Sequence, residues 1–273
     1  METTLTMLVV VAVIALSCQY MSVSIGIGYG TVLTPILLIM GFSPLQIVPA
    51  VLISQLAGGL IGGLAHHRAG NLTLDFRRGD NPIKGRLRRL GYLPRSEDSK
   101  VILILASCGV IGVLAGVVTA VNISEVIVEA YIGVMVLGIG LAVLFQRSKK
   151  NAFSWKGLIP LGLVTAFNKG VSGGGYVPLV TGGQIIGGRD TKSSVGSTTM
   201  SVAFVCMVGF LGYLLMQGDI YWTLAAATIT GSIIAAPFAA MTVSKVSTNK
   251  LKMVIGVATS LLGILTLAKT FIF

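Results

Sequence analysis

Apolar residues gather in long runs along the chain, with short polar segments between them. A run of about 20 apolar residues can cross a hydrocarbon core as a helix, because a helix satisfies its own backbone hydrogen bonds in lipid. Full-length helices are therefore predicted over residues 4–25, 45–66, 101–121, 126–146, 192–216, 221–243 and 251–271. Shorter apolar pieces are predicted over residues 31–40, 157–167 and 177–186.

Composition places these helices in a membrane. Hydrophobic residues fill 54% of the 273 positions, charged residues only 11%, and the mean hydropathy is +0.90. Soluble domains are about one quarter charged. We expect an all-α polytopic membrane protein with about 8–10 membrane segments in one integral membrane domain. Residues 1–4 contain no Lys or Arg, and the apolar run that follows is longer than that of a signal peptide, so the first segment is expected to remain as a span.

An internal repeat divides the chain into halves at residues 1–146 and 147–273. A shift of 147 residues aligns both halves without gaps and repeats one layout: an apolar piece, a glycine cluster, a half-length piece, a polar corner and a long span. The aligned identical pairs are Gly26 with Gly173, Gly28 with Gly175, Tyr29 with Tyr176, Gly41 with Gly188, Val48 with Val195, Ser54 with Ser201, Gly62 with Gly209 and Leu64 with Leu211.

The basic residues predict how the halves are oriented. Nine Lys or Arg against four acidic residues lie in the loop 67–100, and cytoplasmic loops are the ones rich in Lys and Arg. With this loop in the cytoplasm and each glycine-broken segment returning to the side it entered from, 18 of the 20 Lys and Arg are cytoplasmic and the N-terminus is outside. The long spans that follow the two hairpins then run in opposite directions, which makes the repeats inverted. Eight simple spans with parallel repeats are the alternative.

Two glycine-rich stretches interrupt the apolar pattern, at residues 26–30 and 168–178. Non-helical backbone at membrane depth survives where it lines a cavity or is buried in protein. Glycine lets successive amides turn toward an anion, and the half-length helices present their N-termini there. Lys169 adds a full positive charge. The candidate substrate-binding residues are Gly26, Gly28, Tyr29, Gly30, Asn168, Lys169, Ser172, Gly173, Gly174, Gly175, Tyr176 and Thr181.

Two structural alternatives exist for these residues. The glycines can serve only to let helices pack closely, as small residues do in membranes. Lys169 can reach the membrane interface with its amino group instead of facing a ligand. Ser22 occupies the position equivalent to Lys169 in the first half, so a site built around the lysine would be asymmetric.

Other functional classes have weak support. The three cysteines stand alone in apolar runs, and no cluster of His, Asp and Glu or nucleophile–base pair lies in the spans, so neither an enzyme nor a cofactor or metal site is predicted. The net charge of +11 reflects membrane orientation, and nucleic acid is not an expected partner. The expected partners are the lipid bilayer, a small anionic substrate, a coupling proton or sodium ion, and a second copy in a homodimer.

At the glycine stretches the sequence resembles the sulfite exporter TauE/SafE family, also called the TSUP transporters. Three segments carry the resemblance: Gly26–Pro35, Ser172–Thr181, and Gly188-Arg-Asp190 leading into Val195–Thr198. The segment His66–Asn71 is similar to the one that closes the second span in one branch of the family. Two features depart from the family pattern, since Ile27 and Tyr29 separate the first glycines and the loop 72–99 is long and basic.

The resemblance implies a secondary transporter in the inner or plasma membrane, coupled to an ion gradient and working by alternating access. Its implied substrates are small sulfur-containing or organic anions such as sulfite, sulfonates or thiosulfate. An anion channel and a transporter of non-sulfur carboxylates are the rival interpretations, because both would use the same donors.

Overall fold

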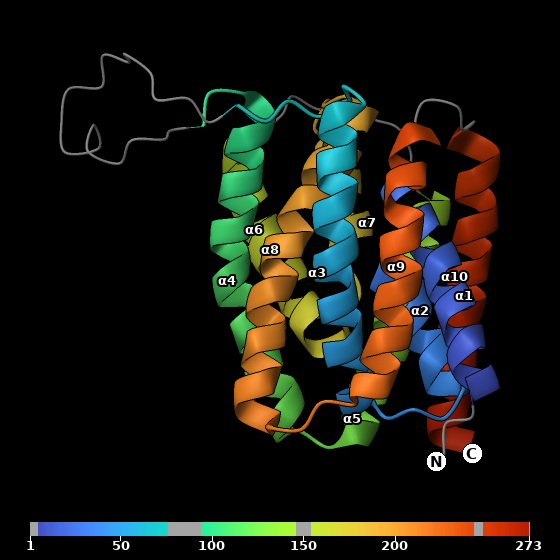
Figure 1. Cartoon of the computed structure of the whole chain (residues 1–273). Helices are drawn as coiled ribbons and strands as arrows, with labels where there is room; N and C mark the ends of the chain where they lie inside the picture. The colour runs from blue at the N-terminus through green and yellow to red at the C-terminus, as the bar shows by residue number, and fades with distance from the viewer. Residues whose placement is uncertain (1–4, 76–93, 146–153, 243–247, 273) are drawn as a thin grey trace.

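The computed structural model describes residues 5–75, 94–145, 154–242 and 248–272, and these ranges form ten helices (Figure 1). No strand occurs in these ranges. The helices are α1 (Leu5–Ile25), α2 (Tyr29–Ile39), α3 (Pro44–Arg68), α4 (Glu97–Asn122), α5 (Glu125–Phe145), α6 (Trp155–Ser172), α7 (Tyr176–Ile186), α8 (Thr191–Gln217), α9 (Trp222–Thr242) and α10 (Thr248–Ile272). The predicted fold class, an all-α membrane protein, is confirmed.

Six helices are long and apolar enough to cross a membrane: α1, α3, α4, α5, α8 and α9. Shorter apolar helices are α2, α7 and the described part of α10 from Gly256. The long helices begin and end within a few residues of the predicted spans. Most of the basic loop, residues 76–93, lies outside the described residues, as do residues 146–153 and 243–247.

One predicted boundary was wrong. The second glycine stretch was expected to interrupt the chain after residue 167, but α6 continues through Lys169 to Ser172. The residue that follows its end, the C-cap Gly173, is the first one there with a left-handed backbone (φ 68°). Because only glycine adopts this conformation without strain, the break falls at the first glycine of the triplet and Gly170 remains helical.

The two glycine hairpins, α1–α2 and α6–α7, open toward opposite ends of the bundle. The corner after α2 lies with the α8–α9 turn, because the rings of Phe42 and Tyr221 are 6.2 Å apart. The corner after α7 lies with the start of α4, because Arg189 pairs with Asp98. Both chain termini lie at the end toward which α1–α2 opens (Figure 1).

Helices from the two halves of the chain are packed together. The pairs α4 with α6 and α1 with α9 form two of the largest contacts, and α3 packs against α8. Glycines let the backbones approach: a β-carbon at Gly112 would lie 2.3 Å from the carbonyl oxygen of Leu163, and one at Gly231 would lie 2.2 Å from that of Ala12. Close packing by small residues is how helices associate without water. Because α6 packs on α4 and α1 packs on α9, the turns of both hairpins lie in the interior of the bundle.

Candidate functional site

The turns of the two hairpins meet inside the bundle. A β-carbon at Gly30 would lie 1.7 Å from the carbonyl oxygen of Gly173, and one at Gly174 would lie 3.1 Å from the carbonyl carbon of Gly30. The residues around both turns are buried. The glycine clusters therefore bring two irregular backbone segments into direct contact, and no side chain fits between them.

The contacts between the hairpins are reciprocal. Gly26 faces Thr181, and Gly173 faces Thr34. The two contacts are equivalent under the 147-residue shift, because Gly26 corresponds to Gly173 and Thr34 corresponds to Thr181. A second reciprocal pair follows the same rule: Gly28 approaches Pro178, and the Gly175 amide donates to Thr31 Oγ1 at 3.1 Å.

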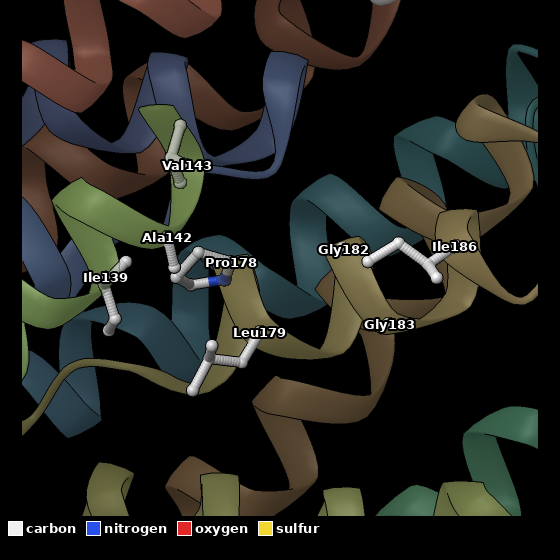
Figure 2. A pocket seen from close by; sticks show the side chains of 8 residues that line it. All are labelled: Ile139, Ala142, Val143, Pro178, Leu179, Gly182, Gly183 and Ile186. Carbon is white, nitrogen blue, oxygen red and sulfur yellow. The ribbon is translucent and has the colours of Figure 1, made fainter. Parts of the chain in front are cut away.

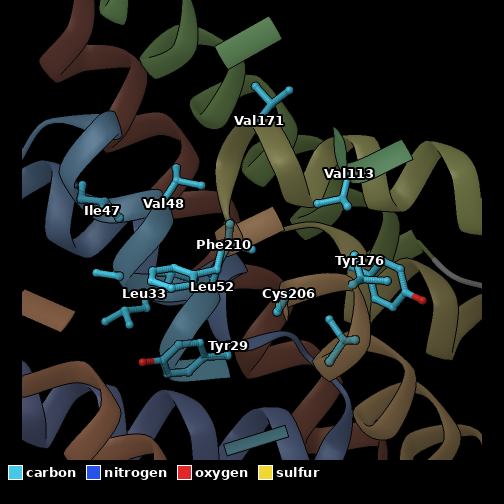
Figure 3. Packing of buried hydrophobic residues seen from close by; sticks show 14 of the residues in the cluster. Tyr29, Leu33, Ile47, Val48, Leu52, Val113, Val171, Tyr176, Cys206 and Phe210 are labelled. Carbon is cyan, nitrogen blue, oxygen red and sulfur yellow. The ribbon is translucent and has the colours of Figure 1, made fainter. Parts of the chain in front are cut away.

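The tyrosines at equivalent positions have equivalent partners. Ser54 Oγ donates to Tyr29 Oη at 2.9 Å in the first half, and Tyr176 Oη donates to Ser201 Oγ at 3.3 Å in the second. Their hydroxyl groups point away from each other (Figure 3). Both tyrosines therefore brace a hairpin against the following long helix, and neither hydroxyl group faces the contact between the hairpins.

Lys169 is buried, with 1% of its surface exposed. Its amino group donates to Gln55 Oε1 and to the carbonyl oxygen of Gly173. The side chain thus stays inside the protein and does not reach the membrane interface. Gln55, on α3, was not predicted as a site residue, although a glutamine in an apolar run is a recognisable signal.

Several predicted donors already have protein partners. The amides of Gly173, Gly174 and Gly175 donate to Lys169 O, Ser172 Oγ and Thr31 Oγ1. Asn168 accepts from Tyr131 through its side-chain oxygen, and Ser172 Oγ also donates to Asn168 O at 2.6 Å. These residues hold the second turn in shape.

The half-length helices are left without side-chain caps. Gly28 and Gly175 occupy the N-cap positions of α2 and α7 with no capping hydrogen bond, whereas serine or aspartate side chains cap α4, α6 and α8. Uncapped helix N-termini carry partial positive charge and free amides. The hydroxyl oxygens of Thr34 and Thr181, one on each half-length helix, have no hydrogen-bond partner in the described part of the chain.

An ion pair that the sequence did not predict lies at the end of the bundle toward which α6–α7 opens. The Arg189 guanidinium donates to Asp98, Gln184, Ser193 and Ser197. The neighbouring Asp190 caps α8 by accepting from the amides of Lys192 and Ser193. Because Asp98 is far away in sequence, at the start of α4, only the packing of α4 on α8 brings the charges together.

An apolar cavity of about 210 Å³ lies between α5 and α7 (Figure 2). It is lined by Ile139, Ala142, Val143, Pro178, Leu179, Gly182, Gly183 and Ile186. Pro178 also touches the first hairpin, since a β-carbon at Gly28 would lie 2.7 Å from its Cδ. Pro178 is therefore shared by the wall of the cavity and the contact between the hairpins. Within the described ranges, no group of three His, Cys, Asp or Glu residues could hold a metal ion.

The fold and this arrangement define a class: a polytopic helical membrane protein with broken helices meeting in its interior, the construction common among secondary transporters. A model of the sulfite exporter TauE/SafE family matches residues 90–266. The probable membrane transporter protein YtnM of Bacillus subtilis (strain 168) is 25% identical over 261 residues, which cover 91% of this chain and 79% of YtnM. No solved structure matches the chain.

The family match covers more than half of the chain. The chain therefore belongs to the sulfite exporter TauE/SafE family and is a membrane transporter of that family.

Proposed function

We propose that the protein is a secondary transporter of small sulfur-containing or organic anions such as sulfite, sulfonates or thiosulfate. It works by alternating access and is driven by an ion gradient. Residues 1–146 and 147–273 act as inverted repeats, and the substrate binds where their hairpins meet. The protein lies in the plasma membrane with the loop 67–100 in the cytoplasm.

The reciprocal contacts between the hairpins carry this proposal. Inverted repeats with broken helices place their substrate site near the middle of the membrane, where the halves meet. Here the contacts Gly26–Thr181 and Gly173–Thr34 exchange under the 147-residue shift, and the hairpins open toward opposite ends. Two equivalent elements that meet in this way can open alternately, one toward each side.

Charge favours an anion at this position. The N-termini of α2 and α7 have no side-chain cap, so both direct partial positive charge into a region of low dielectric constant. Lys169 is the charged residue nearest the turns in sequence, and its acceptors, Gln55 Oε1 and Gly173 O, are neutral. An anionic substrate would balance this positive charge.

The apolar cavity supports organic anions as part of the substrate range. It lies beside Pro178 and is lined by aliphatic side chains, which suit an alkyl group and not a second charged group. A sulfonate could place its charged head between the hairpins and its carbon chain in this cavity.

The test is anion flux into proteoliposomes that contain the purified protein, measured for sulfite, thiosulfate, a short alkyl sulfonate and a short carboxylate. We expect gradient-driven flux of at least one sulfur oxyanion, and a loss of at least about tenfold in Lys169→Ala because the fixed charge is removed. Lys269→Ala is the matched control, since this lysine donates to Leu38 O, at the opposite end of α2 from the hairpin turn.

Three results would contradict the proposal. The first is wild-type flux in Lys169→Ala, which would remove the lysine from the site. The second is unitary currents, which would indicate an anion channel. The third is the absence of transport for every anion in the series.

A further inference from the structure

Threonines buried in helices usually donate their hydroxyl hydrogen to a carbonyl one turn earlier, and four buried threonines in the described residues do so. Thr165 donates to Leu161 O at 2.7 Å, Thr199 to Val195 O at 2.8 Å, Thr228 to Leu224 O at 3.0 Å and Thr266 to Leu262 O at 2.8 Å. This bond satisfies the hydroxyl within its own helix. A buried threonine whose hydroxyl has neither this bond nor any other partner needs an explanation, because an unpaired buried hydroxyl costs free energy.

Thr34 and Thr181 are two such exceptions. They are 1% and 3% exposed, and their Oγ1 atoms have no partner in the residues that the structure describes. Of the buried side-chain atoms without a partner in this part of the chain, only these two can donate a hydrogen bond; the others are the Gln19 and Gln217 side-chain oxygens. The two threonines are 147 residues apart, so the same exception occurs at equivalent positions in both halves.

Both hydroxyls face the opposite hairpin. Thr34 Oγ1 lies 3.2 Å from the place where Gly173 would carry a β-carbon, and Thr181 Oγ1 lies 3.2 Å from the corresponding place at Gly26. Each unpaired hydroxyl therefore lies against the turn that precedes the other half-length helix, and at Gly26 the methyl group of Thr181 is also in contact. Because these turns have glycine at the contact, small movements of the hairpins would open space directly in front of the hydroxyls.

The surroundings select the ligand chemistry. Thr34 is on α2 and Thr181 on α7, and both of these helices have a glycine at the N-cap with no side-chain capping hydrogen bond. The amides of Gly173, Gly174 and Gly175 are already bonded within the protein, so they do not supply the missing donors. Two hydroxyl donors beside two helix N-termini suit an atom group that only accepts hydrogen bonds and carries negative charge.

We propose that Thr34 and Thr181 are the two donors that bind the oxygens of the transported oxyanion, one from each half of the protein. This inference rests on the proposed function and gives it a substrate class: a compact anionic head with at least two oxygens on one central atom, such as sulfite or a sulfonate. The hydroxyls are kept unpaired in the closed protein because their partners are the substrate oxygens, which arrive when the hairpins separate.

Isosteric substitutions test the inference. Thr34→Val and Thr181→Val keep the shape of the side chain and remove the hydroxyl, and Thr165→Val does the same to a hydroxyl bonded within its own helix. We expect the melting temperature of Thr34→Val and Thr181→Val to stay unchanged or rise, because an unpaired buried group is removed. The flux of sulfite and methanesulfonate through these variants in proteoliposomes should fall at least about tenfold, because each variant loses one hydrogen bond to a charged group.

Two further measurements complete the test. Thr165→Val should keep wild-type flux, and its melting temperature should fall if it changes at all. Thr34→Ser and Thr181→Ser restore the hydroxyl without the methyl group and should recover most of the flux. Sulfite should raise the melting temperature of the wild-type protein and not that of either valine variant.

Distinct outcomes overturn the inference and the proposed function. Wild-type flux in both valine variants would overturn the inference and leave the proposed function standing. A lower melting temperature together with reduced flux in both variants would show a structural role and would also overturn it. If the wild-type protein moves none of the oxyanions, the proposed function fails and the inference falls with it.

Discussion

At the scale of single residues, the buried ion pair between Asp98 and Arg189 ties several segments together at its end of the bundle. Its side chains are 11% and 5% exposed, and Asp98 also accepts from Ser193 and from the Thr73 amide. The carboxylate therefore joins α4, α8 and the segment after α3. A buried charge that loses its partner is strongly destabilising.

We expect Asp98→Asn to lower the free energy of unfolding by about 3 kcal/mol, because Arg189 would keep its buried charge without a carboxylate. Thermal unfolding in detergent measures this as a lower melting temperature. Asp190→Asn is the matched control, since asparagine caps a helix as well as aspartate and the Arg189 pair is untouched. Equal stability of the two variants would contradict the role given to Asp98.

Residue patterns predicted part of the site. Lys169 and Thr181 were recognisable because a charge and a hydroxyl beside glycines are unusual in an apolar run. The contacts of Gln55, Thr34 and Asp98 could not be predicted, because each of these residues meets a residue more than 90 positions away, and only tertiary packing brings them together. A sequence shows which side chains are costly to bury, and the fold decides which of them meet.

At the scale of helices and turns, the closest contact between the hairpins depends on Gly30. This glycine is inside α2 and has an ordinary helical backbone, so only the space around it matters. A β-carbon there would lie 1.7 Å from Gly173 O and 3.0 Å from Val51. Both neighbours are held by surrounding helices, so a methyl group would push the hairpins apart.

Gly30→Ala is therefore expected to lower the melting temperature and to abolish anion flux. Gly138→Ala is the control: this glycine is in α5 with nothing within 4 Å of its β-carbon position, so alanine should raise stability by up to about 1 kcal/mol through helix propensity. Thermal unfolding and proteoliposome flux of both variants measure the difference. A Gly30→Ala protein that is as stable and as active as Gly138→Ala would show that the hairpins do not need this contact.

The boundaries of most helices could be predicted, since apolar runs end at polar or glycine corners such as Gly41-Phe42-Ser43. The end of α6 could not. Glycine is permitted within a helix as well as at its end, and hydropathy does not distinguish Gly170 from Gly173. Packing decides, because Gly170 lies against Gly116 of α4, where a helical backbone fits closely.

At the scale of the whole molecule, charge is distributed unevenly between the two ends. Basic residues lie at or next to the helix ends that meet where α6–α7 opens (Figure 1): Arg68, Arg95, Lys100, Lys156 and Lys192. The opposite end holds both termini and the turn after α8 with Asp219. Since cytoplasmic loops are the basic ones, this asymmetry predicts that the α6–α7 hairpin opens to the cytoplasm and the α1–α2 hairpin to the outside.

Single cysteines at the two ends test this orientation. Cys18, Cys108 and Cys206 are free and are first replaced by alanine. Asp219→Cys and Lys192→Cys then each place one thiol on an exposed residue, at opposite ends of α8. We expect a membrane-impermeant maleimide to label Asp219→Cys on intact cells, and Lys192→Cys only after permeabilisation. The reverse pattern would invert the molecule in the membrane, and labelling of both thiols on intact cells would contradict the proposal that α8 crosses the membrane between them.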